Sequence, residues 1–181
     1  EPFTYDQAYL DELGELFTSY QDTCAGLQQF RQYLQQARAY VQGKALQEGE
    51  IITPDGKKTS LLSQLKKDRY TVIDFWASWC SPCRADIPHI KEVYEKYKDK
   101  GLNVLAISFD SNKAAWKSAL KKLKMPWEQL IEVNGTNSDL AKAYQIYGIP
   151  YGILLDSEGT IIAVRLHAQS LEEFLLKEGL K

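Results

Sequence analysis

Residues 70–84 read YTVIDFWASWCSPCR, and this segment limits the folds that the chain can adopt. Its first seven residues, Tyr70–Trp76, are almost continuously apolar, which is typical of a central strand buried on both faces of a sheet. Cys80 and Cys83 follow within a few residues, and a helical pattern starts at Ser81. The segment therefore predicts a buried strand, a turn that ends on the first cysteine, and a helix that carries the second.

The composition excludes several classes of protein. With 44% hydrophobic and 25% charged residues among 181, the chain is neither disordered nor collagen-like. A formal net charge of −2 provides no overall field that would attract nucleic acid, so we expect no nucleic-acid partner, and we expect a monomer. Apolar runs such as Tyr151–Leu155 fall far short of the roughly 20 residues that span a bilayer.

The start of the chain lacks the usual marks of translation and export. Its only methionine is Met125, and no charged segment followed by an apolar one stands at the beginning. We therefore expect a processed or trimmed chain, in which any targeting or anchoring segment is missing.

The first 43 residues differ in texture from the rest. They are rich in Gln and Tyr, contain no Val or Ile before Val41, and place apolar residues at helical spacing. A break near residues 19–23 predicts two helices, and Gly43 ends the pattern. The sequence predicts a helical N-terminal arm or linker at 1–43 and a separate domain at 44–181.

Strand-like and helical patterns alternate through residues 44–181. They predict a hairpin at 51–59, a short helix at 60–67, a helix at 81–100 interrupted at Pro88 and closed by Gly101, a strand at 102–109, helices at 113–123 and 138–147, a hairpin at 152–166, and a last helix from a Ser170 cap to Lys177. This order predicts an α/β fold, with a mixed central sheet and helices on both faces.

The position of the cysteine pair predicts its chemistry. At the first turn of a helix, free backbone N–H groups stabilise an anion, so the pKa of the Cys80 thiol should fall from about 8.5 toward about 7 or below. We expect its sulfur to lie at an open edge and to act as the nucleophile in disulfide exchange. Cys83 lies one turn along, where it can attack the resulting mixed disulfide. Pro82 suits the early helix because no N–H donor is needed there.

Two carboxyl groups flank this pair in the sequence. Asp74 interrupts the apolar strand, where burial should raise its pKa, and a carboxyl that titrates near neutral pH can take the proton from Cys83. Asp86 lies three residues beyond Cys83 and can project toward the same site. The alternatives are a merely structural acid for Asp74 and a solvated first-turn acid for Asp86.

Other uses of the cysteines are weaker. A zinc site needs four ligands, and the rest of the chain offers Cys24, His89 and His167. His89 lies nearly two turns beyond Cys83 on the same predicted helix. Burial as two inert thiols is the other alternative. We therefore expect no metal site and no cofactor.

Residues 74–84, DFWASWCSPCR, resemble the active-site segment of the thioredoxin superfamily. The added Asp86 and Pro88 make the segment most similar to the TlpA/ResA-like branch of thiol-disulfide oxidoreductases, whose members usually have Glu where this chain has Asp86. Tyr147–Tyr151, YGIPY, matches the second landmark of the family. The resemblance covers residues 46–181 and implies a thioredoxin-like fold, with an extra strand and helix within 102–145.

The resemblance also implies how a substrate is held. Pro150 would follow a cis peptide bond and face the cysteines, and Ile149 would present backbone groups to an extended substrate strand. Trp79 and Pro82 would form an apolar rim. The chain departs from the family at residues 48–52, EGEII, which replace the usual entry to the first hairpin.

The function expected from both arguments is that of a thiol-disulfide oxidoreductase. It would reduce or exchange disulfides in client proteins and be reset by an upstream dithiol electron donor. The resemblance implies a place in the cell envelope or periplasm, with an anchor in a segment absent from this chain, and a role like those in cytochrome c maturation.

Two other functions are compatible with the sequence. One is a redox-sensing or partner-binding module that docks through the N-terminal helices. The other is a thiol peroxidase, although that mechanism expects Pro and Thr where this chain has Ile73 and Ala77.

Overall fold

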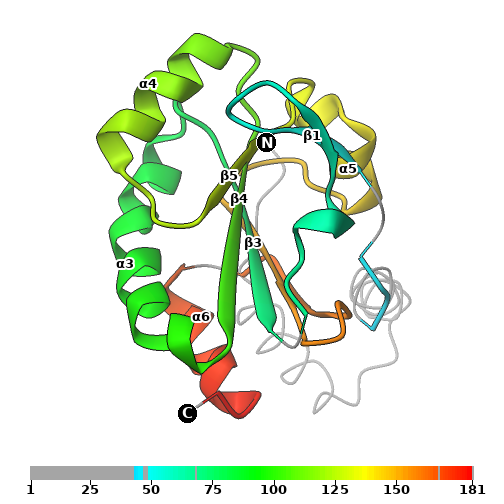
Figure 1. Ribbon diagram of the computed structural model, residues 1–181, viewed down its shortest axis with the longest axis vertical. Coiled ribbons are helices and arrows are strands. Elements are labelled where there is room, and N and C mark those ends of the chain that lie inside the picture. The colour runs from blue at the N-terminus through cyan, green and yellow to red at the C-terminus, as the bar shows by residue number, and fades with distance from the viewer. Residues whose placement is uncertain (1–42, 47–48, 68, 167, 181) are drawn as a thin grey trace, which may run out of the picture.

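The computed structural model describes residues 43–46, 49–67, 69–166 and 168–180. A single sheet with strand order β2-β1-β5-β4-β3-β6-β7 forms its centre (Figure 1). The strands are β1 (Glu50–Ile52), β2 (Lys58–Ser60), β3 (Tyr70–Trp76), β4 (Leu102–Ser108), β5 (Glu128–Ile131), β6 (Tyr151–Leu155) and β7 (Ile161–Val164). The helices are α3 (Ser81–Tyr97), α4 (Lys113–Leu123), α5 (Asp139–Ala143) and α6 (Ala168–Lys177), with 3-10 turns η1 (Leu62–Gln64), η2 (Lys98–Lys100) and η3 (Gly135–Asn137).

The middle of the sheet is parallel and its flanks are antiparallel. β3 pairs in parallel with β4 along its whole length, and β4 pairs in parallel with β5. β6 runs antiparallel to β3, and β1 runs antiparallel to β5. The predicted mixed sheet is confirmed, and the predicted central strand matches β3 residue for residue. Because parallel strands end at the same edge, the loops after β3 and β4 lie beside each other.

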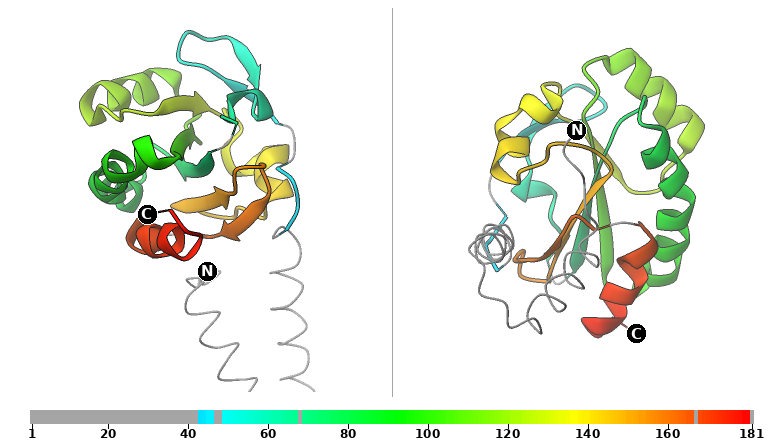
Figure 2. Two further views of the ribbon diagram at one scale, coloured as in Figure 1. Left: turned by 60° about the horizontal axis from the view of Figure 1, so that its bottom comes forward. Right: turned by 180° about the vertical axis from the view of Figure 1, so that it is seen from behind.

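Helices cover both faces of the sheet, as predicted. α3, α4 and α6 lie on one face, and α5 lies on the other (Figure 1). Figure 2 shows the same layers from two further sides. Alternate residues of β3 point into opposite cores, since Val72 and Trp76 pack under α3 while Ile73 and Phe75 pack toward α5.

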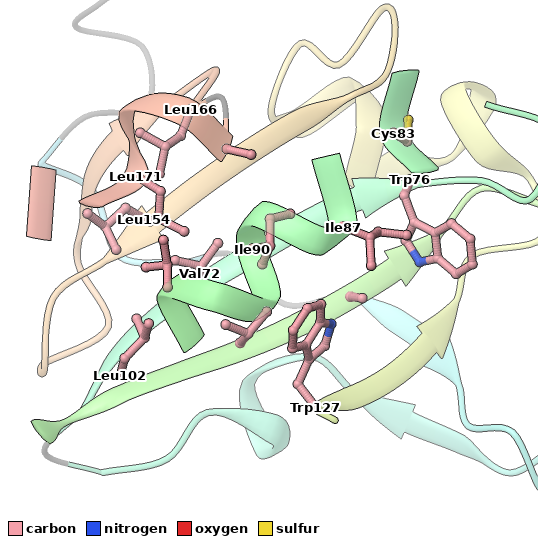
Figure 3. Packing of buried hydrophobic residues seen from close by; sticks show 14 of the residues in the cluster. Val72, Trp76, Cys83, Ile87, Ile90, Leu102, Trp127, Leu154, Leu166 and Leu171 are labelled. Atoms are coloured by element: carbon pink, nitrogen blue, oxygen red, sulfur yellow. The ribbon is translucent and has the colours of Figure 1, made fainter. Parts of the chain in front are cut away.

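Cys83 belongs to the first of these cores. Figure 3 shows it at one end of the cluster, beside Trp76 and Ile87. The cluster continues under α3 and α6 through Ile90, Leu154 and Leu171. Complete burial of an aliphatic side chain stabilises a fold by about 1.5–3 kcal/mol, so this core fixes the position of α3 firmly on the sheet.

Four predicted helices differ from the observed ones. α3 runs through Pro88 without a break, because Pro88 and Arg84 are exposed and water can reach the Arg84 carbonyl that Pro88 leaves without a partner. The predicted helix at 60–67 contains only the turn η1. α5 ends at Ala143, two residues before Gln145 adopts a positive φ of 52°. α6 starts at Ala168, so Ser170 lies inside the helix rather than at its cap.

Residues 43–46 lie along the outer edge of β7. The amide of Gly43 donates to the Ile161 carbonyl at 2.8 Å, and the amide of Leu46 donates to the Gly159 carbonyl at 3.1 Å. The helices predicted for the first 43 residues, together with Cys24 and His167, lie outside the described residues. Among the helices that the structure describes, none has the length and apolar character to cross a membrane.

Candidate active site

The turn between β3 and α3 places the first cysteine at the start of the helix. The amide of Cys80 donates to the Ala77 carbonyl at 3.1 Å, which closes the turn. Cys80 is the N-cap of α3, and its Sγ accepts a hydrogen bond from the Cys83 amide at 3.2 Å. Pro82 lies in the first turn, as predicted. The sulfur therefore sits where amide groups and the helix dipole stabilise a negative charge.

Cys80 and Cys83 are joined by a disulfide, with their Cα atoms 5.3 Å apart. Both residues are buried: 4% of Cys80 and 2% of Cys83 is exposed. The expectation of a sulfur at an open edge is thus wrong for the oxidised protein. The loop before β6 contributes to the cover of Cys80, since the carbonyl oxygen of Ile149 lies 3.8 Å from the Cys80 Sγ.

That loop contains the cis peptide bond that the resemblance implied, between Ile149 and Pro150. Some apolar and aromatic side chains next to the cysteines and next to this bond in the sequence are exposed. Trp79 is 66% exposed, and Pro82 is exposed as well. Tyr147, for which the sequence predicted no role of its own, is 74% exposed and lies two residues before Ile149. Its place within the YGIPY landmark was the available signal.

Asp74 lies in the middle of β3, between Ala106 of β4 and Gly152 of β6. It is 7% exposed. Burial, and secondly the charge of Asp86, raise the pKa of the Asp74 carboxyl to about 7. This agrees with the raised pKa expected from the sequence, and it allows the carboxyl to hold or accept a proton near neutral pH.

Asp86 approaches Asp74 across a small cavity. The cavity has a volume of about 20 Å³, and the residues that line it include Asp74, Asp86 and Pro150. Gln169 of α6 donates a hydrogen bond from its Nε2 to Oδ1 of Asp86 at 3.2 Å. Asp86 is half-buried and faces this cavity, so it is not simply a solvated acid of the first helical turn.

Besides Tyr147, the sequence also predicted no role for Asp110, which lies just beyond β4. Its carboxylate binds Ser78, in the turn that leads to Cys80. The signal in the sequence was its place at the carboxyl end of a predicted parallel strand, beside the loop that follows β3.

The described residues contain no group of three or more His, Cys, Asp or Glu side chains that could hold a metal ion. His89 lies at the surface of α3, with its Nδ1 4.0 Å from a carboxylate oxygen of Glu92. The zinc alternative therefore gains no support from the part of the chain that the structure covers.

Known proteins with similar sequences and structures include several thiol-disulfide oxidoreductases. A family model described as thioredoxin-like matches residues 68–161. The thiol-disulfide oxidoreductase ResA of Bacillus thuringiensis subsp. konkukian is 31% identical over 126 residues, which cover 68% of this chain and 70% of ResA. The thioredoxin-like protein YneN of Bacillus subtilis is 28% identical over 135 residues, or 73% of this chain and 75% of YneN.

Solved structures give the same picture. A thiol-disulfide oxidoreductase from Bacteroides fragilis is 32% identical, with a TM-score of 0.67, over 75% of this chain and 99% of that structure. The thioredoxin domain of a thiol-disulfide oxidoreductase from Bacteroides vulgatus is 30% identical, with a TM-score of 0.68, over 78% of this chain and 99% of that domain.

Proposed function

Since the chain belongs to the thioredoxin-like family and is a ResA-like thiol-disulfide oxidoreductase, we propose that it reduces disulfides in client proteins, with Cys80 as the attacking sulfur and Cys83 as the resolving one. The observation that supports these roles best is the disulfide at the start of α3, where the Cys83 amide donates to the Cys80 Sγ. A thiolate at Cys80 would be stabilised by the same amide.

The reaction exchanges one disulfide for another. The Cys80 thiolate attacks a sulfur of the client disulfide, which forms a mixed disulfide and releases one client thiolate. The Cys83 thiol then loses its proton, and its thiolate attacks the Cys80 Sγ, which releases the second client thiolate. The client disulfide is reduced by two electrons and the Cys80–Cys83 dithiol is oxidised. An upstream dithiol donor would return the pair to its reduced form.

Asp74 would accept the proton that Cys83 loses. Its pKa of about 7 lets it alternate between the two protonation states at neutral pH. Asp86 would connect Asp74 to the surface, because both residues line the same cavity. Asp86 is one methylene shorter than the Glu usual in similar chains, and the hydrogen bond from Gln169 fixes its orientation.

The client would bind as an extended segment along residues 147–150. The Ile149 carbonyl, next to the Cys80 sulfur, is placed to accept a backbone hydrogen bond from that segment. Pro150 would shape the groove. The exposed rings of Trp79 and Tyr147, with Pro82, would supply apolar contacts on either side of the disulfide.

The direction of electron flow, the location and the division of the chain also belong to this proposal. Ser and Pro between the cysteines resemble the reducing members of the family, which favours a reductase. We place it in the cell envelope or periplasm, where disulfides persist. Residues 1–43 would form an arm or linker ahead of a catalytic domain at 44–181.

Trapping the mixed disulfide tests the two sulfur roles. In a Cys24→Ser background, reduced Cys83→Ser protein is mixed with a synthetic peptide that contains an intramolecular disulfide, and adducts are located by peptide mass spectrometry. We expect a stable adduct at Cys80. The matched Cys80→Ser variant should form none. An adduct at Cys83 in that variant, or no adduct at Cys80 in the first, would contradict the proposed roles.

A further inference from the structure

Asp110 is a buried acid that the exchange reaction does not use. It lies two residues beyond Ser108, the last residue of β4, and only 1% of it is exposed. A buried carboxylate is costly unless its oxygens accept hydrogen bonds, so the identity of its partners indicates what it holds in place.

The Asp110 carboxylate accepts two hydrogen bonds from a single residue in the active-site turn, Ser78. The Ser78 amide donates to Oδ2 at 2.7 Å, and the Ser78 hydroxyl donates to Oδ1 at 2.6 Å. Both the backbone and the side chain of Ser78 are therefore bound to one carboxylate, which fixes their orientation as well as their distance.

A serine of β4 fixes the carboxylate itself. The Ser108 hydroxyl donates to Oδ2 of Asp110 at 2.7 Å and accepts from the Asp110 amide at 3.0 Å. Ser108 is fully buried and pairs with Trp76 of β3 in the sheet. The carboxylate is thus attached to the rigid centre of the fold, and Ser78 is attached to the carboxylate.

Ser78 lies inside the turn that ends at the attacking sulfur. The turn is closed by the hydrogen bond from the Cys80 amide to the Ala77 carbonyl, so Ser78 and Trp79 are its two central residues. The Cys80 side chain must stay at the N-cap position to accept from the Cys83 amide. A shift of the turn would move Cys80 away from that amide and would tilt the exposed Trp79.

We infer that Asp110 is a positioning residue for the thiol-disulfide reaction, which holds the Ala77–Cys80 turn through Ser78 so that the Cys80 sulfur stays at the N-cap of α3. The inference rests on the proposed role of Cys80 as the attacking sulfur. It gives Ser78 and Asp110 a joint effect on the reactivity of Cys80, in addition to any effect on stability.

A double-mutant cycle on Cys80 reactivity separates this effect from the negative charge of Asp110. Reduced proteins in a Cys24→Ser background are treated with iodoacetamide at pH 7, and modification of Cys80 is followed by peptide mass spectrometry. Asp110→Asn removes a charge near the sulfur, but it does so equally with Ser or Ala at position 78, so this contribution cancels in the cycle.

We expect Ser78→Ala to slow alkylation of Cys80 about three- to tenfold in the Asp110 protein and by a smaller factor in the Asp110→Asn protein. An amide there has one neutral acceptor oxygen where the carboxylate has two charged ones, so Ser78 has less to lose. The alkylation rates of the four proteins in the cycle should converge above pH 10, where the Cys80 thiol is fully ionised in each of them. Ser111→Ala, an exposed serine on the same segment, is the control and should leave the rate unchanged.

An equal effect of Ser78→Ala in both backgrounds, or none in the Asp110 protein, would overturn the inference. If Asp110→Asn does not fold, Ser78→Ala alone remains decisive, because an unchanged rate in a folded protein excludes the positioning role. A wild-type Cys80 that reacts no faster than an ordinary thiol would instead count against the proposed function itself.

Discussion

Replacing Asp74 with Asn should change how the stability of the oxidised protein depends on pH. Asp74 is buried in the middle of β3, and its pKa is about 7 against an ordinary value of 3.8. The folded protein therefore keeps a proton on this carboxyl over a pH range in which the unfolded chain has lost it.

The sign follows from the number of bound protons. Between the two pKa values the folded state binds one proton more than the unfolded state, so the free energy of unfolding falls as pH rises. The stabilisation that the Asp74 proton gives the folded state is fully present below pH 3.8. It decreases between pH 3.8 and about pH 7, and it is lost above that range. About three pKa units at 1.36 kcal/mol each set an upper limit of about 4 kcal/mol on this loss.

Asn keeps the shape of the side chain but has no proton to lose. The free energy of unfolding of Asp74→Asn, relative to that of the wild type, should therefore rise by up to about 4 kcal/mol between pH 4 and pH 8. Any effect of the amide itself on stability is the same at every pH and does not change this difference. Urea unfolding of the oxidised proteins at several pH values measures this difference. Asp139→Asn, at a fully exposed acid on α5, is the control and should follow the wild type.

Parallel stability curves for Asp74→Asn and the wild type would contradict a raised pKa at Asp74. They would mean that the Asp74 carboxyl has the same pKa in the folded and unfolded states. A buried acid with a raised pKa would then be absent, and the proposed route for the Cys83 proton would lose its acceptor.

Two further predictions concern the same region. Asp86→Asn should lower the pKa of Asp74 yet leave it well above 3.8, since burial is the larger cause; a pH dependence identical to that of the wild type would contradict the contact between the two carboxyls. Gly152→Ala should lower the free energy of unfolding by about 1–3 kcal/mol, because its Cβ would lie 2.5 Å from the Leu166 carbonyl oxygen. Gly148→Ala, with no atom within 4 Å of the new Cβ, is the matched control, and equal urea midpoints for the two variants would disprove this close packing.

The sequence was most informative where one element alone carries a strong pattern. The apolar run of β3 and the helical pattern of α3 are long enough to identify without their neighbours. The cysteines lie at their junction, so local reasoning also located the reactive turn and the raised pKa of Asp74.

Features that depend on the packing of distant segments were missed. β5 contains Glu128 and Gln129 and shows no strand pattern of its own; it forms because β4 offers it a parallel partner. The resemblance implied an extra strand in 102–145, but the residues did not locate it. The attachment of Ser78 to Asp110 likewise exists only because β3 and β4 end at the same edge of the sheet.

The most direct test of the whole account is a glutathione redox titration of Cys80 and Cys83, followed by the fluorescence of Trp76 and Trp79. We predict one two-electron transition, absent from Cys80→Ser and from Cys83→Ser, with a potential near the value of about −270 mV known for thioredoxin. No transition would show that the pair is inert. A potential near about −120 mV, as in strong oxidants, would contradict the proposed reduction of clients.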